Sequence, residues 1–365
     1  MSIQSTHRPG RPHPALSRRA LLAGTAAGAV GLSLAACGKG KKNRSQADSK
    51  TVTVVTHDSF HVSEDLQKAF TSETGYTLKV ATSGDAGALV NKLVLTKDAP
   101  LGDAVFGIDN TYATRALDQG VIDTSATVTL PKGAESYVVA DTPALAPIDV
   151  GDVCLNIDTG YFTGKGLTPP ATFEDLTKPE YKGLLVAINP TNSSPGMAWL
   201  LATIGHFGAG SFAGYWKQLM ANGARIAEDW SAAYETDFSG SGKGTYPIVV
   251  SYASSPSFTV SKDKSSSTTS ALLDTAFRQV EYAGVLKGAA NPEGGKAFVT
   301  WMLSKAVQED IPGQMYMYPV LPDAALPEAL TKFGPLSKSP VKVEPKEITT
   351  HREEWLNTWT EAVGK

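Results

Sequence analysis

The chain has 365 residues, a formal net charge of −3, and hydrophobic and charged fractions of 42% and 19%. This length exceeds that of most single cores and fits two lobes of ordinary domain size, and the composition predicts a packed soluble body rather than disorder. The slight acidity excludes a strongly basic nucleic-acid-binding protein as the default class.

The first 36 residues have the pattern of an export signal. They hold four arginines and no acid, and an apolar run rich in Ala, Gly and Leu extends from residue 20 to residue 36. A spanning helix needs about 20 strongly apolar residues, so we favour a removable signal over an anchor that stays in the membrane. Residues 17–22, which include Arg18 and Arg19, resemble a twin-arginine signal, and a general export route is the alternative.

Residues 34–37, Leu-Ala-Ala-Cys, look like a bacterial lipobox. In that kind of signal the chain is cut before the cysteine, here Cys37, and lipid is attached to its sulfur. We therefore expect a protein anchored to the outer face of the cell membrane. Residues 37–50 are polar and rich in Lys, Ser and Gly, as expected of a flexible tether.

Strand and helix patterns then alternate along the chain. Strands are predicted over residues 51–56, 76–81 and 103–108, and helices over residues 63–74, 86–97 and 110–119. This order predicts an α/β fold with a mainly parallel sheet that is covered on both faces.

Each of these three strands is followed by a loop that holds an acid beside small polar residues. The acids are Asp58, Asp85 and Asp109. Open α/β sheets bind ligands beyond the carboxyl ends of their strands, so we expect at least one of the three to face a ligand. The alternative for each acid is that it caps the helix that follows.

A second α/β unit follows. Its predicted strands are residues 153–157, 184–188 and 246–252, and its predicted helices are residues 197–207, 211–222 and 231–238. A strand at residues 279–286 is predicted to return to the first lobe, followed by helices over residues 292–305 and 347–363. In the last helix, Trp355, Trp359 and Val363 recur every four residues, which favours a docking stripe over a ligand cage.

The sequence contains no set of residues suited to catalysis or metal binding. It lacks a Gly-x-Ser-x-Gly elbow, HExxH and CxxC. Residues 238–245 resemble a phosphate loop, but Asp237 and Gly244 stand where the first glycine and the final hydroxyl residue should be. We predict no catalytic residue, metal or cofactor, and we predict that Cys154, in an apolar stretch, is a buried inert thiol.

Two other segments suit a ligand better. Residues 189–196 follow a strand and open a helix, where hydroxyls and backbone N–H groups suit a phosphate; the alternative is N-capping by Ser193 or Ser194. Trp230 beside Asp229 suits a flat cation; the alternative is a core anchor.

Taken together, these features resemble the thiamine-binding proteins of bacterial import systems, within the two-lobed type II periplasmic binding proteins. The matching stretches are residues 56–60, 107–110, 189–196, 229–234, 251–256, 311–320 and 352–359. No single stretch is diagnostic, whereas their joint order along nearly the whole chain after the lipobox is specific.

The resemblance implies a ligand-binding set drawn from both lobes. It comprises Asp85, Ala86, Ser193, Ser194, Trp230, Tyr252, Ala253, Ser254 and Ser255, with His57, Phe258 and Tyr316 enclosing the ligand's rings. Asp109 joins the set from its strand-end loop. The family often has Tyr at positions 57 and 258, Trp at position 316 and Gly at position 86.

The resemblance also implies a domain organisation and a function. Lobe 1 is expected to comprise residues 51–148 and 259–320, lobe 2 residues 149–258, and a C-terminal helical segment residues 321–365. The lobes would close over thiamine or a thiamine phosphate in the cleft between them and deliver it to an ABC permease. We expect a monomer that binds no nucleic acid and catalyses no reaction.

Two alternatives stay open at this point. One is a binding protein of the same fold for ferric ion, a polyamine, sulfate or a phosphonate, with Tyr316 and Tyr318 as the nearest candidates for iron ligands. The other is an exported enzyme.

Overall fold

The structure is a computed structural model that describes residues 50–241 and 243–364. The predicted export signal, the lipobox with Cys37 and nearly all of the tether lie outside the described residues. In the described part, no helix is long and apolar enough to cross a membrane.

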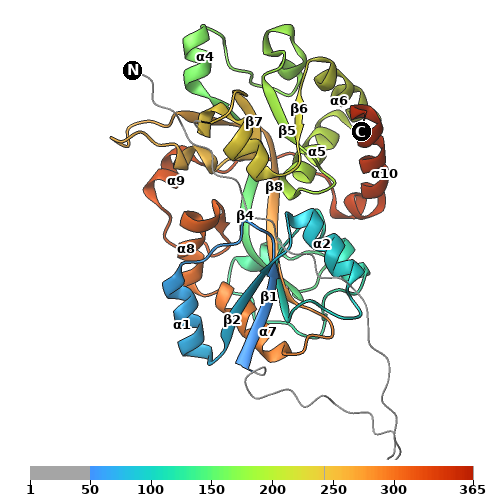
Figure 1. Cartoon of the computed structure of the whole chain (residues 1–365), viewed down its shortest axis with the longest axis vertical. Helices are drawn as coiled ribbons and strands as arrows, with labels where there is room; N and C mark the ends of the chain where they lie inside the picture. The colour runs from blue at the N-terminus through green and yellow to red at the C-terminus, as the bar shows by residue number, and fades with distance from the viewer. Residues whose placement is uncertain (1–49, 242, 365) are drawn as a thin grey trace, which may run out of the picture. The chain divides into compact units, whose positions relative to one another are not determined.

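The described residues form one mixed sheet, in the order β2-β1-β3-β8-β4-β7-β5-β6 with β9 beside β4 (Figure 1). The strands are β1 (Thr51–Thr56), β2 (Thr77–Thr82), β3 (Ala104–Asp109), β4 (Leu145–Asp158), β5 (Leu185–Ile188), β6 (Arg225–Ala227), β7 (Ile248–Tyr252), β8 (Thr269–Val285) and β9 (Tyr318–Pro319). We call β2, β1 and β3 the β1 end of the sheet, and β7, β5 and β6 the β5 end. Within each end, neighbouring strands are parallel. β1 pairs with β2 and β3 at the β1 end, and β5 pairs with β6 and β7 at the β5 end.

Helices cover both ends of the sheet. Those that accompany the β1 end include α1 (Glu64–Thr74), α2 (Ala86–Leu95), α3 (Ala113–Asp118) and α7 (Pro292–Met302). Those that accompany the β5 end include α4 (Thr159–Lys165), α5 (Ser194–Phe207) and α6 (Phe212–Ala221). The later helices are α8 (Lys305–Met315), α9 (Glu328–Phe333) and α10 (Pro345–Val363).

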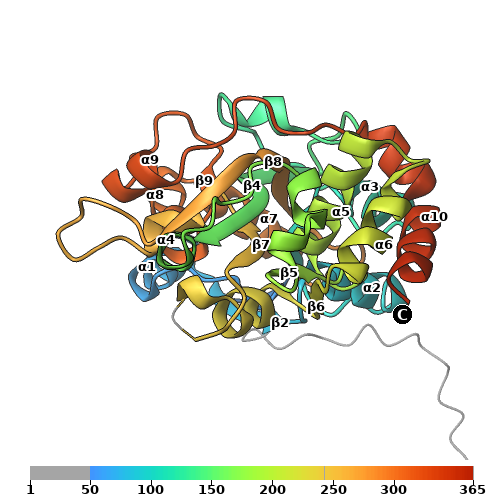
Figure 2. The same ribbon diagram turned by 90° about the horizontal axis from the view of Figure 1, so that it is seen from above.

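The two long strands β4 and β8 run through both ends and join them. They pair with each other antiparallel along most of their lengths, and their register shifts between Val153 and Leu155. One part of β8 pairs with β3, while β4 pairs with β7. Figures 1 and 2 show this pair passing between the β1 end and the β5 end. The predicted return of the chain to the first unit through a strand at residues 279–286 is thereby confirmed.

The last helix, α10, docks along its predicted tryptophan stripe. Trp355 and Trp359 are buried, and the Trp359 ring meets that of Trp216 on α6 edge-on, with centroids 5.7 Å apart. The same helix places the Arg352 guanidinium 4.2 Å from the centroid of Tyr112, at the start of α3. α10 therefore packs against elements that accompany both ends of the sheet.

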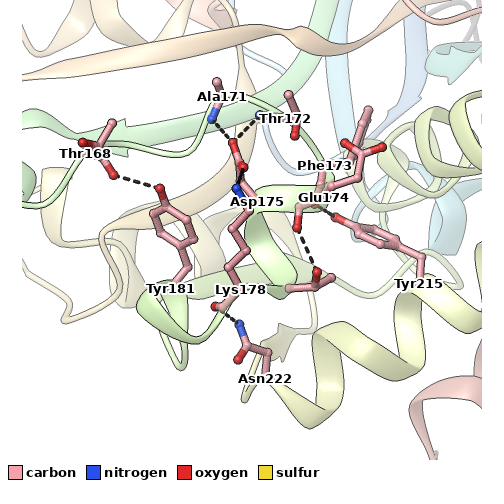
Figure 3. A network of polar contacts seen from close by, with 11 residues as sticks. Thr168, Ala171, Thr172, Phe173, Glu174, Asp175, Lys178, Tyr181, Tyr215 and Asn222 are labelled. Atoms are coloured by element: carbon pink, nitrogen blue, oxygen red, sulfur yellow. Dashed lines mark hydrogen bonds and ion pairs between the residues drawn. The ribbon is translucent and has the colours of Figure 1, made fainter.

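A polar network fastens the segment between α4 and β5 to α6 (Figure 3). The Tyr215 hydroxyl donates to the carbonyl of Phe173, and the Asn222 side chain donates to the carbonyl of Lys178. Asp175 accepts from the backbone of residues 171 and 172 and pairs with the Lys178 ammonium at 2.6 Å. These bonds hold in place the irregular segment that leads into β5, and the loop after β5 carries site residues.

Several predicted elements differ from those observed, and the predicted strand at 279–286 is only the last part of β8. The predicted strand at 153–157 is the last part of the longer β4, and the predicted helix at 292–305 ends at Met302 because a turn separates it from α8. The predicted helix at 231–238 is a short π-helix, Ala232–Asp237. Such bulged turns are common beside functional sites. Cys154 is fully buried, as predicted, and burial raises the pKa of its thiol.

Candidate functional site

A cavity of about 270 Å³ lies where the carboxyl ends of five strands converge. The loops after β1, β2, β5 and β6 and the last residue of β7 all contribute to it, joined by β8 and the end of α8. The lining residues are His57, Asp58, Ser59, Asp85, Ser194, Pro195, Trp230, Ser231, Glu235, Tyr252, Glu281, Gln314, Met315, Tyr316 and Met317. Both ends of the sheet therefore supply its walls, as expected for an open α/β sheet.

Trp230 is held in a fixed orientation at the entry to the π-helix. Its indole N–H donates to the Ser251 hydroxyl at 2.9 Å, and that hydroxyl is also 2.9 Å from the Ser255 hydroxyl. The Tyr234 ring stacks on the indole with centroids 5.0 Å apart and planes 11° apart. Because these contacts fix the ring before any ligand arrives, little side-chain entropy is lost when a ligand binds against it.

Tyr316 closes the aromatic side of the cavity. It ends α8 in the left-handed backbone region, with φ of 65°, which is uncommon for a residue with a side chain. Its ring lies edge-on to Trp230 at 5.9 Å and against Phe258 at 3.6 Å between centroids. Phe258 therefore supports Tyr316 from outside the cavity, and it is 39% exposed.

Asp85 connects the two ends of the sheet. As the N-cap of α2, its carboxylate accepts from the backbone N–H of Ala86 at 2.6 Å, and it also accepts from the N–H of Ser194 at 3.3 Å. Burial raises the pKa of Asp85, against the opposing effect of these hydrogen bonds and of His57. Asp85 therefore caps α2 and also lines the cavity.

Two acids face each other at the back of the cavity. Asp149 on β4 and Glu281 on β8 are directly paired in register, and both are buried. Burial, together with the neighbouring Glu281, raises the pKa of Asp149 well above its usual range. This shift favours the protonated form of Asp149, and Glu281 is the member of the pair that lines the cavity.

His57 lies against Glu281. Its Nε2 is 3.4 Å from the Glu281 carboxylate, an ion-pair distance rather than a well-aligned hydrogen bond, and its Nδ1 accepts from the N–H of Ser59. Burial by itself lowers the pKa of His57, but Glu281, Asp85 and Asp58 outweigh burial and raise it above its ordinary value. The neighbouring acids therefore favour the protonated ring over the neutral one.

The comparisons with known proteins fit this geometry. Residues 103–334 match the family described as bacterial extracellular solute-binding protein. The chain belongs to this family.

Several relatives of this solute-binding protein have curated names. The thiamine-binding periplasmic protein of Salmonella typhimurium is 27% identical over 326 residues, covering 86% of this chain and 94% of the relative. The protein of the same name from Haemophilus influenzae is 22% identical, covering 87% and 93%.

Solved structures share the fold. A periplasmic thiamin binding protein superposes with a TM-score of 0.75 at 25% identity, covering 86% of this chain and 96% of that one. AfuA from Actinobacillus pleuropneumoniae, with fructose-6-phosphate bound, gives 0.71 at 16%, and iron-bound HitA from Pseudomonas aeruginosa gives 0.67 at 20%; each covers 86% of this chain and 99% of the other. The solute-binding protein therefore has the predicted two-lobed periplasmic binding protein fold.

The structure brings six of the thirteen residues expected to bind ligand into the cavity lining: His57, Asp85, Ser194, Trp230, Tyr252 and Tyr316. The other seven are not among the residues that line the cavity. Ser193 is the N-cap of α5, Asp109 accepts two bonds from Thr111, and Ser255 supports Ser251. The remaining four are Ala86, Ala253, Ser254 and Phe258.

Sequence reasoning missed Glu281 as a site residue of this solute-binding protein. A signal was present, because an acid in the middle of a predicted buried strand is unusual unless it is paired or functional. The side chains from the end of α8 and the π-helix, such as Gln314 and Glu235, carried no comparable signal.

The tyrosines named for the iron alternative point to different places. Tyr316 lines the cavity, whereas the buried Tyr318 donates its hydroxyl to the carbonyl of Gly334. Within residues 50–241 and 243–364, no group of three or more His, Cys, Asp or Glu side chains is arranged to hold a metal ion.

Proposed function

We propose that this solute-binding protein captures thiamine, or a close relative of it, in the cavity between the two ends of its sheet. The observation that carries the proposal is the oriented indole of Trp230 in a cavity lined by acids. Such a cavity suits a flat, positively charged heterocycle. The names of the curated relatives support the same ligand class.

The ligand would be held by stacking and charge. Rings placed against Trp230 and Tyr316 gain on the order of 1–2 kcal/mol for each buried aromatic or cation–π contact. Glu281 and Asp85 offset the positive charge of a thiazolium. Ser194 and Asp85 offer polar partners to a hydroxyethyl group.

We further propose that the two ends of the sheet are the lobes that close on the ligand, bending at β4 and β8. Binding would then stabilise the closed arrangement, which an ABC permease would recognise. We also propose export, lipid attachment at Cys37 and a monomeric state. The protein would release its ligand unchanged, without turnover.

The sharpest test is titration calorimetry of Trp230→Ala, made in a chain lacking the export signal and lipid. We expect thiamine affinity to fall at least about tenfold, because more than one contact of this size is lost. Trp230→Phe keeps an aromatic face and should lose less. Tyr161→Ala, which removes a partly buried aromatic outside the cavity, is the matched control and should bind as the unaltered protein does.

Spermidine and ferric citrate belong in the same titrations. Unchanged thiamine affinity in a folded Trp230→Ala protein would refute the stacking role. Tight binding of either alternative ligand, with none for thiamine, would refute the proposed ligand.

A further inference from the structure

The two ends of the sheet also touch outside the cavity, at the side chain of Tyr112. This residue precedes α3 at the β1 end and is fully buried. Its hydroxyl donates to the carbonyl of Pro190, in the loop after β5, at 3.2 Å. Neither residue lines the cavity. The contact therefore joins the two ends at a place that a ligand in the cavity does not touch.

The ring of the same tyrosine carries a second contact, from α10. The guanidinium of Arg352 lies 4.2 Å from the centroid of the Tyr112 ring. α10 lies beside α3 and beside α6, where Trp359 packs on Trp216 (Figure 2). Because α6 accompanies the β5 end, Arg352 is held by that end and reaches Tyr112 at the other.

Arg352 is poorly suited to a purely packing role. Its side chain is buried, and its Nε has no hydrogen-bond partner among the described residues. A terminal nitrogen donates to the exposed carboxylate of Glu353 at 2.9 Å. Burial of a guanidinium with a donor unpaired costs free energy that a nonpolar side chain of similar length would avoid. Its place on the Tyr112 ring favours a role in holding the two ends together.

We propose that Tyr112 and Arg352 form a latch that stabilises the closed arrangement of the two ends and so raises thiamine affinity from outside the cavity. This inference rests on the proposed function. When the ends separate, the Tyr112 hydroxyl loses the carbonyl of Pro190 and its ring loses the guanidinium, so the latch favours the closed arrangement alone. A ligand that selects this arrangement binds more tightly where it is more populated. Both are positioning residues that touch no ligand.

Two variants test the latch from opposite ends of the sheet, so either one suffices if the other does not fold. Tyr112→Phe removes only the hydroxyl, and Arg352→Met removes the charge but keeps a long side chain. In calorimetric titration we expect each to bind thiamine about three- to tenfold more weakly. Stopped-flow tryptophan fluorescence should show faster dissociation with an association rate changed by less than about twofold, because the latch forms only after closure.

Matched controls make the same chemical changes within one end. Tyr181→Phe removes a hydroxyl that donates to the carbonyl of Thr168 at 2.9 Å, in the segment between α4 and β5. Arg115→Met removes a guanidinium that donates to Asn91 at 2.6 Å, between α3 and α2. Both should keep the affinity and the rates of the unaltered protein.

The outcomes separate the latch from the proposed function. Unchanged affinity and dissociation in folded Tyr112→Phe and Arg352→Met would overturn the latch and leave the proposed function standing. An equal loss of affinity in the two controls would also overturn it, because the effect would then come from a general loosening of the fold. Absence of thiamine binding by the unaltered protein would overturn the proposed function itself.

Discussion

At the residue scale, the site is a small set of acids whose charges depend on one another. Asp149 and Glu281 are paired across β4 and β8, and the His57 ring lies 3.4 Å from the Glu281 carboxylate. Asp58 and Asp85 were predictable, because a strand followed by an acid in a loop marks the carboxyl edge of a sheet. The partnership of Asp149 with Glu281 was not, because only the register of two strands far apart in sequence brings them together.

This arrangement predicts that thiamine affinity rises with pH. Below its raised pKa, His57 is protonated and repels a cation; that charge is lost as pH rises through the pKa. Asp109, which does not line the cavity and whose pKa burial raises to about 7, becomes negative over the same interval. Both changes favour a cation, so we expect affinity to increase roughly three- to tenfold from pH 6 to pH 8 and then level off.

Titration calorimetry across this range is the measurement. His57→Gln should bind more tightly at pH 6 and show a shallower slope, whereas His61→Gln, at an exposed histidine outside the lining, should keep the original profile. An affinity that falls with pH would contradict the assigned charges.

At the element scale, the regular strands and helices were the most predictable features. The β-branched run of β1 and the residues of α2 and α10 have clear periodicity and clear ends, and they occur within a few residues of the predicted positions. The π-helix after Trp230 and the turn before α8 were not predictable, because tertiary contacts rather than local propensity decide them. The π-helix supplies Glu235 to the cavity lining, which explains why this part of the site escaped prediction.

The docking of α10 gives a prediction about stability. Trp359 is 1% exposed and packs against Trp216, so Trp359→Ala leaves a cavity between α10 and α6. We expect a loss of about 3–5 kcal/mol in the free energy of unfolding, measured by urea denaturation. Glu361→Ala, an exposed position on the same helix, should change it by no more than about 0.5 kcal/mol. A Trp359→Ala protein as stable as the unaltered one would show that α10 does not contribute to the core.

At the scale of the whole described body, the two ends of the sheet come close together at a glycine. A Cβ added to Gly87 on α2 would lie 2.7 Å from the backbone oxygen of Asn192, which belongs to the β5 end, and 2.7 Å from the Tyr112 hydroxyl. Such contacts are too short for a side chain to be tolerated without movement. A side chain at position 87 therefore acts as a wedge between the two ends.

We expect Gly87→Val to bind thiamine at least about tenfold more weakly, because the clash with Asn192 is relieved when the ends separate, while the Tyr112 side chain has to shift in either arrangement. Small-angle X-ray scattering should show a larger radius of gyration with thiamine present than for the unaltered protein. Gly164→Val on α4, where a Cβ meets nothing within 4 Å, is the control. If Gly87→Val had the thiamine affinity and the radius of gyration of the unaltered protein, a side chain at position 87 would not hold the two ends apart.

The two strands that pass through both ends also determine when the molecule can fold. β3 and β4 can complete their strand pairing only after β8 has been synthesised. β8 begins more than a hundred residues after either of them. Until β8 arrives, β3 presents an unpaired edge that can join another chain. Pairings this distant in sequence are slow to form. We therefore expect the described body to fold late and in one step. Until nearly all of the chain has been synthesised, its unpaired strand edges have to be kept from pairing with other chains.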